Sequence, residues 1–525
     1  MNSDVSSAAN NLIAGTFTKY LLLAFNIGTG IFLMPFTVHH LGQAEYGLWM
    51  LVASMTYYFQ LLDMGYGNGI VRHIVAADRR GDIDGVNSIA STFVCVYGAI
   101  GLAACALIVG MIMWVVPRFP HLSPADVHTA QALMAIIGVR VALGFPMTVF
   151  GAVTNARQGF VLNNGVSIVA VLMNAALTYV VLERGHGLVT LVGATTLVNV
   201  LSYAGYAWTA RHVFPELRIR ARYFSRAHWR EVTTFSVYLF VIQIASQISF
   251  NIDNVVIGAV MGTAAVAVYT VALRLADYQR RLCDQFSGML FSIAIGFGAE
   301  GNIAALRQTL IEGTRVAITL VVGASVCLIG FSGPLIHHWM GAEFDGSVAP
   351  FIVLAVAGII VVSQAAVGNV LIATGSHKLL AAVWVGEAIV NLPVSLLLVH
   401  RIGLLGVAIG TLTPLAWGHL GVLLPRACRA VALPIRTCLA ETLWPAVAGG
   451  SVAVAVCLLL RMMLPPVTTR GVLMEASATG ASYAIGVFVL GFSGAMRARY
   501  LSLAVELLRT IRHTPAVTPP AQVES

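Results

Sequence analysis

Charged side chains are scarce in this sequence. Only 10% of its 525 residues are Asp, Glu, Lys or Arg, whereas 58% are hydrophobic and the mean hydropathy is +0.85. A soluble domain carries charge at roughly a quarter of its positions, so this composition excludes an ordinary soluble protein and predicts an all-α polytopic membrane protein. The net charge of +8 would suggest nucleic acid as the partner of a soluble domain, but here basic loops on one side of a membrane account for it.

Several chemical features are also absent. The seven cysteines have no paired spacing, and the pairs His39/His40 and His337/His338 fall in predicted outer loops without further ligands. We therefore expect no disulfide, no metal site and no cofactor. The first apolar run, 12–36, lacks the basic start and small-residue cleavage site of a signal peptide, so it is expected to remain as a span.

Catalytic domains and nucleotide-binding loops are missing as well. No predicted outer loop is longer than about fifteen residues, which leaves no room for an extramembrane catalytic domain. No loop of the G-x-x-x-x-G-K-S/T type occurs, which argues against direct use of ATP. We expect a protein that is not an enzyme and that functions within the membrane.

Long apolar segments recur along the whole chain. Because a span needs about 20 apolar residues, we predict fourteen transmembrane helices. They are expected at 12–36, 47–70, 87–116, 128–153, 163–183, 187–209, 232–258, 264–297, 307–332, 347–372, 379–399, 404–425, 443–464 and 471–494. Of the loop arginines and lysines, only Arg118, Arg184, Arg401 and Arg470 fall on one side. The positive-inside rule then predicts that both termini are cytoplasmic.

The two halves of the chain resemble each other. The segments 41–49 (LGQAEYGLW) and 81–83 (GDI) align with 261–269 (MGTAAVAVY) and 301–303 (GNI) at one shared offset of 220 residues. A shared offset indicates a duplication of six helices. The predicted domains are a six-helix lobe at 1–210, a basic cytoplasmic linker at 211–231, a second six-helix lobe at 232–427, helices 13 and 14 at 428–494, and a cytoplasmic amphipathic helix with a disordered tail at 495–525.

Some of the predicted spans contain basic residues. Charges inside a membrane normally face a protein interior or a water-filled cavity and are often functional. The candidate cations are Lys19, Arg140, Arg274, Arg281 and Arg315. Arg140 lies about twelve residues into its span, which at 1.5 Å per residue is near mid-membrane. If these cations line one cavity, they would bind an anion such as phosphate or pyrophosphate, because guanidinium groups offer paired donors that match phosphate oxygens.

A second interpretation of these charges is mutual neutralisation. Asp277 and Arg281 are four residues apart, as are Arg280 and Asp284, so one helix could pair its own charges. Lys19, Arg140 and Arg274 have no carboxylate within one helical turn except Asp277 beside Arg274, so they are the first choices for cavity cations. The acids in or beside spans are candidates for coupling or gating: Asp63, Asp253, Asp277 and Glu387. Glu387 could bind a proton or cation, pair with a base, or stay protonated.

Amide side chains follow one face of the span 232–258. They are Gln243, Gln247, Asn251 and Asn254. Each amide both donates and accepts hydrogen bonds, so this stripe would suit the hydroxyl groups of a sugar. Amides also bridge packed membrane helices, and the sequence leaves both interpretations open.

Two stretches carry a family resemblance. The run PFTVHHLGQAEYGLWMLVASMTYYFQLLDMGYGNGIVRHI and the later run NIDNVVIGAVMGTAAVAVYTVALRLADY resemble the bacterial polysaccharide repeat-unit flippases (O-antigen or exopolysaccharide, Wzx-type). These belong to the multidrug, oligosaccharidyl-lipid and polysaccharide exporter superfamily. The resemblance implies a MATE-like, V-shaped pair of six-helix lobes around a cavity, with two further C-terminal helices.

The resemblance also implies a function. Such proteins flip an undecaprenyl-pyrophosphate-linked oligosaccharide from the inner to the outer leaflet by alternating access, for lipopolysaccharide or exopolysaccharide biosynthesis. The pyrophosphate would meet Lys19, Arg140 and Arg274, with Arg281 or Arg315 as further contacts. The implied partners are this lipid-linked substrate, membrane lipids, and the polysaccharide polymerase and chain-length machinery.

Three alternatives remain open. A multidrug antiporter on the same scaffold would rely on acids such as Asp63, Asp253 or Glu387. A lipid II flippase is less favoured, because those relatives have an arginine-rich first hairpin where this chain has only Lys19 and Asp63. A membrane glycosyltransferase, ligase or polymerase would need a long outer loop with catalytic groups.

Overall fold

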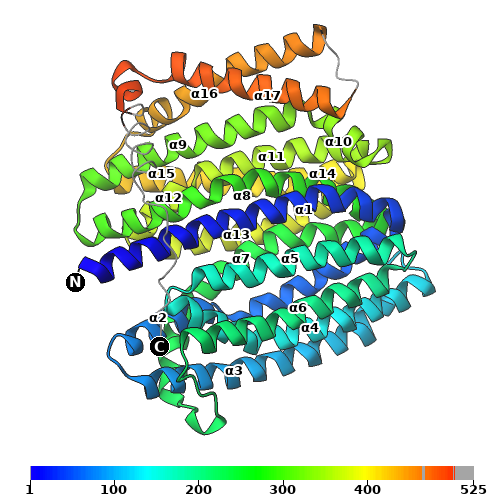
Figure 1. The fold of residues 1–525 in the computed structure, drawn as a ribbon. Helices are drawn as coiled ribbons and strands as arrows, with labels where there is room; N and C mark the ends of the chain where they lie inside the picture. Colours follow the sequence, from blue (N-terminus) through cyan, green and yellow to red (C-terminus); the bar gives the residue numbers. More distant parts are fainter. Residues whose placement is uncertain (1, 464–467, 500–501, 503–525) are drawn as a thin grey trace, which may run out of the picture. The chain divides into compact units, whose positions relative to one another are not determined.

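The computed structural model describes residues 2–463, 468–499 and 502, with side chains described except at 2–13, 68, 234–251, 282–289, 291–293 and 469. Over these residues the secondary structure is helical, without a strand, as the sequence predicts (Figure 1). Eleven helical segments in this part of the chain are long and apolar enough to cross a membrane. The amphipathic helix and tail expected after 499 lie outside the described residues, apart from Ser502.

The first half of the chain forms six long helices and a linker. Its elements are α1 (Asn2–Tyr57), η1 (Tyr58–Asp63), α2 (Tyr66–Asp78), α3 (Ile83–Gly110), η2 (Met111–Val115), η3 (Val116–Arg118), α4 (Pro124–Ala156), α5 (Phe160–Glu183), α6 (Leu188–Val213) and η4 (Ala221–Tyr223).

The second half repeats this order and adds two helices. Its elements are α7 (Arg226–Met261), α8 (Thr263–Ala299), α9 (Ile303–Gly330), α10 (Ser332–Met340), η5 (Ala342–Ser347), α11 (Val348–Ser363), α12 (Ala365–Ala373), α13 (His377–Ile402), α14 (Leu404–Ala416), η6 (Trp417–Leu423), α15 (Leu424–Ala430), α16 (Ile435–Met463), α17 (Thr469–Gly486) and η7 (Val487–Gly491).

All fourteen predicted spans are helical, but the second is interrupted. The range of α1 contains two helices that meet at a kink in the expected loop, because Gly42, with φ of 80° and ψ of 164°, is not helical. The span predicted at 47–70 then passes through η1, and Met64 and Gly65 adopt left-handed backbone angles before α2 begins. Two successive residues in the left-handed conformation end the hydrogen-bond pattern of a helix. The prediction of a single helix at 47–70 is therefore wrong.

Three further expectations need correction. The span predicted at 347–372 is two helices, α11 and α12, divided at Gln364. The span predicted at 404–425 passes from α14 through the π-helix η6 into α15, shortly after Pro414 removes a backbone donor. The histidine pairs do not lie in loops, because His39 and His40 belong to α1, and His337 and His338 to α10.

The duplication predicted from the sequence recurs in the backbone. Gly42 and Gly262 have φ of 80° and 86°, and Gly81 and Gly301 have φ of 69° and 65°. Helices α3 and α9, Ile83–Gly110 and Ile303–Gly330, begin and end at the same offset of 220 residues. Their caps also correspond, because Asp82 accepts a hydrogen bond from the Gly85 amide and Asn302 from the Ala305 amide.

Contacts divide the chain into two compact units. Unit 1 contains residues 1–278, 339–357 and 375–423, and unit 2 contains 279–338, 358–374 and 424–525. Within unit 1, α3 packs on α4 and α4 on α6, which lie side by side in Figure 1. Within unit 2, α9 packs against α12, α16 and α17.

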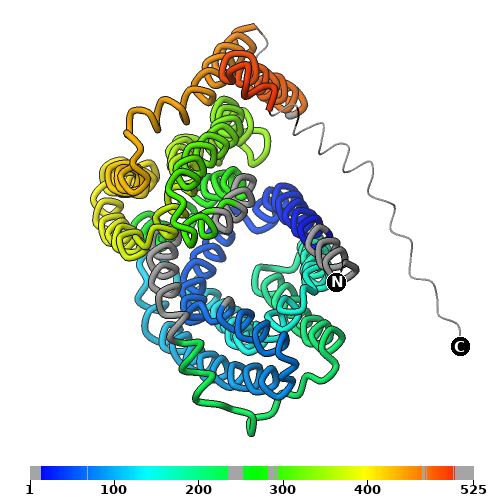
Figure 2. The backbone as a smooth tube through the Cα atoms, turned by 90° about the vertical axis from the view of Figure 1, so that its left-hand side faces the viewer, coloured from blue at the N-terminus to red at the C-terminus, as the bar shows by residue number. Residues whose placement is uncertain are grey.

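The basic linker lies along the first turns of α3 (Figure 2). The Arg218 amide donates to Asn87 Oδ1 at 2.7 Å, and the Ser225 amide donates to Thr92 Oγ1 at 2.9 Å. These bonds give two backbone amides of the linker a hydrogen-bond partner, which a backbone group shielded from water needs. The arginine side chains of this region are all exposed: Arg211, Arg218, Arg220, Arg222, Arg226 and Arg230.

Candidate functional site

Unit 1 holds three of the five predicted cations. Lys19 lies on α1, Arg140 on α4 and Arg274 on α8. Arg140 is half-buried, and the other two side chains are exposed in the protein. Within the described part of the chain, none of the three side chains has a hydrogen-bond or ion-pair partner. Since a lone cation within an apolar span is costly, these are the charges for which a partner from outside the chain is most needed.

Local packing sets the direction of Lys19. Asn164 of α5 donates to Thr18 Oγ1 at 3.0 Å and to the Gly15 carbonyl at 3.2 Å. A Cβ at Gly15 would come within 2.8 Å of Phe160 Cβ, so α1 touches α5 closely at this level. The face of α1 with Gly15 and Thr18 is therefore covered by α5, and Lys19, one residue further round the helix, is left exposed.

The charged residues that follow Arg274 on α8 have interaction partners. Asp277, Arg280 and Arg281 each take part in at least one polar or electrostatic interaction. The side chain of Asp284 lies outside the described residues. Arg281 belongs to unit 2, whereas Arg274 and Asp277 belong to unit 1. A substrate contact at Arg281 stays a prediction.

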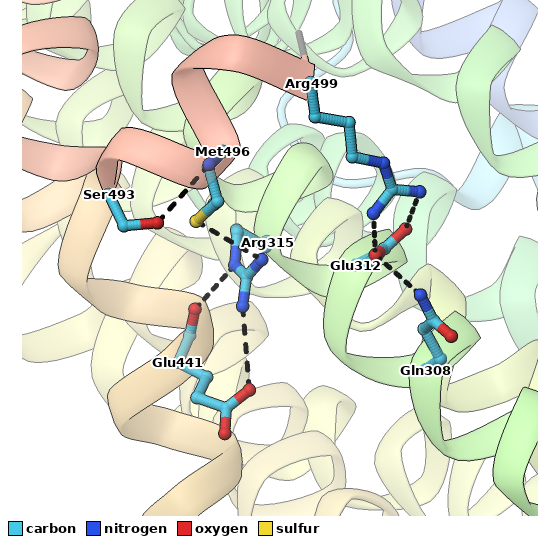
Figure 3. A network of polar contacts seen from close by, with 7 residues as sticks. All are labelled: Gln308, Glu312, Arg315, Glu441, Ser493, Met496 and Arg499. Carbon is cyan, nitrogen blue, oxygen red and sulfur yellow. Dashed lines mark hydrogen bonds and ion pairs between the residues drawn. The ribbon is translucent and has the colours of Figure 1, made fainter.

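Arg315 has partners within the protein. Its Nε donates to the Glu441 carbonyl at 2.7 Å, and its Nη2 lies 3.6 Å from Glu441 Oε2 (Figure 3). Beside it, Arg499 Nη1 lies 2.6 Å from Glu312 Oε1. This network joins α9 to the start of α16 and to the helical turn after Ser493. The position of Arg315 is thus explained by packing, and its predicted contact with a pyrophosphate has no support from these contacts.

The amide stripe is described at one of its four positions. Asn254 is buried, and its Nδ2 donates to Ser54 Oγ of α1 at 2.9 Å. Here the packing interpretation fits, because the amide bridges α7 and α1. The side chains of Gln243, Gln247 and Asn251 lie outside the described residues, so a sugar-binding wall stays a prediction.

The acid Asp253 is the centre of a buried polar cluster. Its side chain is 1% exposed, and its Oδ2 accepts hydrogen bonds from Tyr269 Oη at 2.7 Å and from Thr411 Oγ1 at 3.0 Å. Asn391 Nδ2 in turn donates to Thr411 Oγ1 at 3.2 Å, and Ser395 donates to Asn391. Three helices, α7, α8 and α14, therefore meet at one carboxylate, and α13 joins the cluster through Thr411. The other oxygen, Oδ1, has no hydrogen-bond partner among the described residues.

The other predicted acids have different surroundings. Asp63, at the end of η1, accepts a hydrogen bond from Tyr97 Oη of α3. Glu387 of α13 faces His419 of η6, with 3.7 Å between Oε1 and Nε2. Sequence reasoning missed His419 as a functional candidate. The available signal was an ionisable residue inside the apolar run 404–425, shortly after Pro414.

These features define a multi-pass membrane protein with buried acids, and with cations on its helices that have no hydrogen-bond or ion-pair partner among the described residues. Its fold is that of transporters of the MOP superfamily. A lipid II flippase, MurJ, in an inward closed conformation has a TM-score of 0.69 at 12% identity, covering 90% of this chain and 97% of that one. An inward-facing multidrug resistance MATE family transporter has a TM-score of 0.63 at 16% identity, covering 78% and 95%.

The family is shown by the sequence itself. The model of the polysaccharide biosynthesis protein family matches residues 12–279, which is just over half of the chain. The chain belongs to this family. No curated protein matches the sequence significantly.

Proposed function

We propose that this protein flips an undecaprenyl-pyrophosphate-linked oligosaccharide from the cytoplasmic to the outer leaflet of the bacterial inner membrane by alternating access. In this proposal it is a transporter and not an enzyme, and it supplies repeat units to a polysaccharide polymerase and its chain-length machinery. The observation that carries the proposal is the set of unpaired cations in unit 1, Lys19, Arg140 and Arg274.

The chemistry of these cations supports an anionic headgroup. A lysine supplies a point charge and an arginine a planar fork of donors, and phosphate oxygens accept from both. A cation without a protein partner is ready to pair with a pyrophosphate. Membership of the polysaccharide biosynthesis protein family supports an oligosaccharide on that pyrophosphate.

The exposed arginines of the linker support the proposed orientation. They lie on the side that is richest in basic residues, which the positive-inside rule assigns to the cytoplasm. Their side chains are exposed while the linker backbone is bound to α3. Guanidinium groups arranged in this way would lie against the anionic headgroups of the inner leaflet, with both termini on that side.

The proposal predicts that Lys19→Ala, Arg140→Ala and Arg274→Ala each reduce surface polysaccharide. A hydrogen bond to a charged group contributes about 1.5–3 kcal/mol, which corresponds to about a tenfold loss or more for each variant. The measurement is surface polysaccharide in cells whose only copy of the gene is the variant, with protein in the membrane quantified in parallel.

Arg461→Ala is the matched control for this experiment. Arg461 is also an arginine in an apolar helix, but it is exposed near the end of α16 with its guanidinium 5.5 Å from the Phe331 ring. Its removal should leave polysaccharide unchanged. Normal polysaccharide in all three cation variants, at normal protein levels, would overturn the proposal.

One observation favours a second candidate, a cation-coupled multidrug antiporter. The buried carboxylate of Asp253, with one oxygen unpartnered in the described residues, is the kind of group that such an antiporter needs. In that case Asp253→Asn would abolish drug resistance conferred by overexpression, while surface polysaccharide would not depend on the protein. A lipid II flippase would instead restore growth to cells that lack their own lipid II flippase.

A further inference from the structure

A glutamate and a histidine from different helices meet inside unit 1. Glu387 lies midway along α13, and His419 lies in the π-helix η6. Glu387 Oε1 and His419 Nε2 are 3.7 Å apart, and each side chain is only 10% exposed. Both residues fall in segments apolar enough to span a membrane.

The pair has polar atoms that the described residues leave unsatisfied. Glu387 Oε1, His419 Nδ1 and the indole Nε1 of Trp384 are buried without a hydrogen-bond partner there. Trp384 lies three residues before Glu387, on the same side of α13. Leaving a buried donor or acceptor unpaired costs about 1–3 kcal/mol, so three such atoms at one place indicate a site with a purpose other than packing.

The backbone is shaped to bring the two groups together. Pro414 interrupts the hydrogen bonding of α14, and η6 follows three residues later. A π-turn inserts an extra residue per turn and is frequent at functional sites. At Gly418 a Cβ would overlap Glu387 Oε1 and come within 2.8 Å of Val383 Cγ1. The glycine at this position leaves room for the Glu387 carboxylate between α13 and η6.

We propose that Glu387 and His419 together bind and release one proton and couple it to transport. With one proton the pair has no net charge, as a carboxylic acid beside a neutral imidazole or as a carboxylate beside an imidazolium. Without that proton a carboxylate remains alone in a buried site, and with a second proton an imidazolium does. Because a lone buried charge is costly, each proton exchange changes the energy of the contact between α13 and η6.

Other ionisable groups near the pair are few. Helix α14, which packs on α13, contains none. Helix α7 contributes Asp253, which is bonded to Tyr269 and Thr411. The side chains of 234–251 in α7 lie outside the described residues. Apart from the contact between Glu387 and His419, no ion pair to either is found in the described part of the chain.

A polar path continues from the pair along α13. Asn391 and Ser395 follow Glu387 at spacings of four and eight residues and therefore share its face of the helix. Asn391 donates to Thr411, and Thr411 donates to Asp253. Side chains that both donate and accept hydrogen bonds, as a proton path requires, therefore run from Asp253 through Thr411 to Asn391, which lies one helical turn from Glu387.

The first arm of the test measures proton binding without any substrate. The full-length purified protein is titrated with acid while infrared difference spectra follow the carbonyl band of a protonated carboxyl group. The expected result is a band that is present in the wild type and lost in Glu387→Gln, and that shifts its titration in His419→Gln. Glu183→Gln is the matched control, because Glu183 lies 3.6 Å from His40 in a similar pair with the carboxylate 56% exposed.

The second arm rests on the proposed function and measures transport. The protein is reconstituted in proteoliposomes with a lipid-linked oligosaccharide, and flipping is measured with and without an imposed pH gradient. The wild type and Glu183→Gln should respond to the gradient, while Glu387→Gln and His419→Gln should lose the response. If one of the variants Glu387→Gln and His419→Gln folds poorly, the other still tests the coupling.

The two arms separate the possible failures. An unchanged carboxyl titration in both Glu387→Gln and His419→Gln overturns the proton site whatever the transport result. A gradient response that persists in both variants overturns the coupling. Absence of any flipping by the wild type, together with the expected titration, overturns the proposed substrate and leaves the proton site intact.

Discussion

Asp253 shows at the scale of one residue how a buried acid organises its surroundings. Its Oδ2 accepts from Tyr269 of α8 and Thr411 of α14, which are 16 and 158 residues away in the chain. Buried acids of this kind are stabilised only when their partners are in place. The residue therefore fixes the mutual rotation of α7, α8 and α14 as well as offering an oxygen for coupling.

Replacing Asp253 by alanine should destabilise the protein. The hydroxyl donors of Tyr269 and Thr411 would be left buried without this acceptor, and an unsatisfied buried group costs about 1–3 kcal/mol. Thermal unfolding of the purified protein, followed by tryptophan fluorescence, measures the effect. Asp253→Asn keeps an acceptor oxygen and should lose less stability than Asp253→Ala. Equal unfolding temperatures for Asp253→Ala and the wild type would contradict this role.

Close helix contacts at the scale of elements depend on small residues. In α3, a Cβ at Gly101 would come within 2.5 Å of the Ala142 carbonyl of α4, whereas one at Gly98 would meet nothing within 4 Å. The two glycines are less than one turn apart on the same helix. Only the first lies in the contact between α3 and α4, where backbones approach as they do at small-residue interfaces of membrane helices.

These two glycines give a matched pair of variants. Gly101→Ala should destabilise the fold by about 1–3 kcal/mol, because the backbone of α4 must shift to admit the methyl group. Gly98→Ala should be neutral or stabilising by up to about 1 kcal/mol, since alanine favours the helix more than glycine does. Unfolding temperatures of the two purified variants decide this. A greater loss at Gly98 than at Gly101 would show that the packing of α3 on α4 is wrong.

The interruption of the second predicted span shows the limit of sequence patterns for elements. Hydrophobicity alone predicts one helix at 47–70. Met64 and Gly65 have left-handed angles, and the elements on either side of them, η1 and α2, pack on α3 and α7. Such contacts are between segments far apart in the chain, so local composition does not encode them.

The duplication can be followed in the hydrogen bonds and ion pairs that α3 and α9 make. After the first lobe, the linker is bound by Asn87 and Thr92 in the first turns of α3. After the second lobe, Glu441 and Arg499 are bound by Arg315 and Glu312 on the corresponding part of α9 (Figure 3). In both copies, the third helix of the repeat holds the segment that leaves the lobe, once through neutral polar side chains and once through charges.

The ion pair of Arg315 with Glu441 should stabilise the position of α16 more than the ion pair of Glu312 with Arg499 stabilises the helical turn after Ser493. Arg315 is only 14% exposed and also bonds a carbonyl, so Arg315→Ala should cost about 1.5–3 kcal/mol. Arg499 is 58% exposed, so Arg499→Ala should cost about 0.2–1 kcal/mol. Hydrogen exchange measures the two effects, at 435–441 for Arg315→Ala and at 494–499 for Arg499→Ala. The control is Arg470→Ala, at an exposed position. A larger increase for Arg499→Ala than for Arg315→Ala would contradict this ranking.

The sequence by itself determined the membrane class, most of the long helices, the duplication and which charged residues lie in apolar segments. Each of these depends on the length of apolar runs or on spacing along the chain, which are local properties. Tertiary structure alone decided which charges have partners: Arg315 meets Glu441, Glu387 meets His419, and Lys19 has no hydrogen-bond or ion-pair partner among the described residues. The physical reason is that such contacts depend on how each helix is rotated and aligned against its neighbours, and that is set by packing between residues distant in the chain.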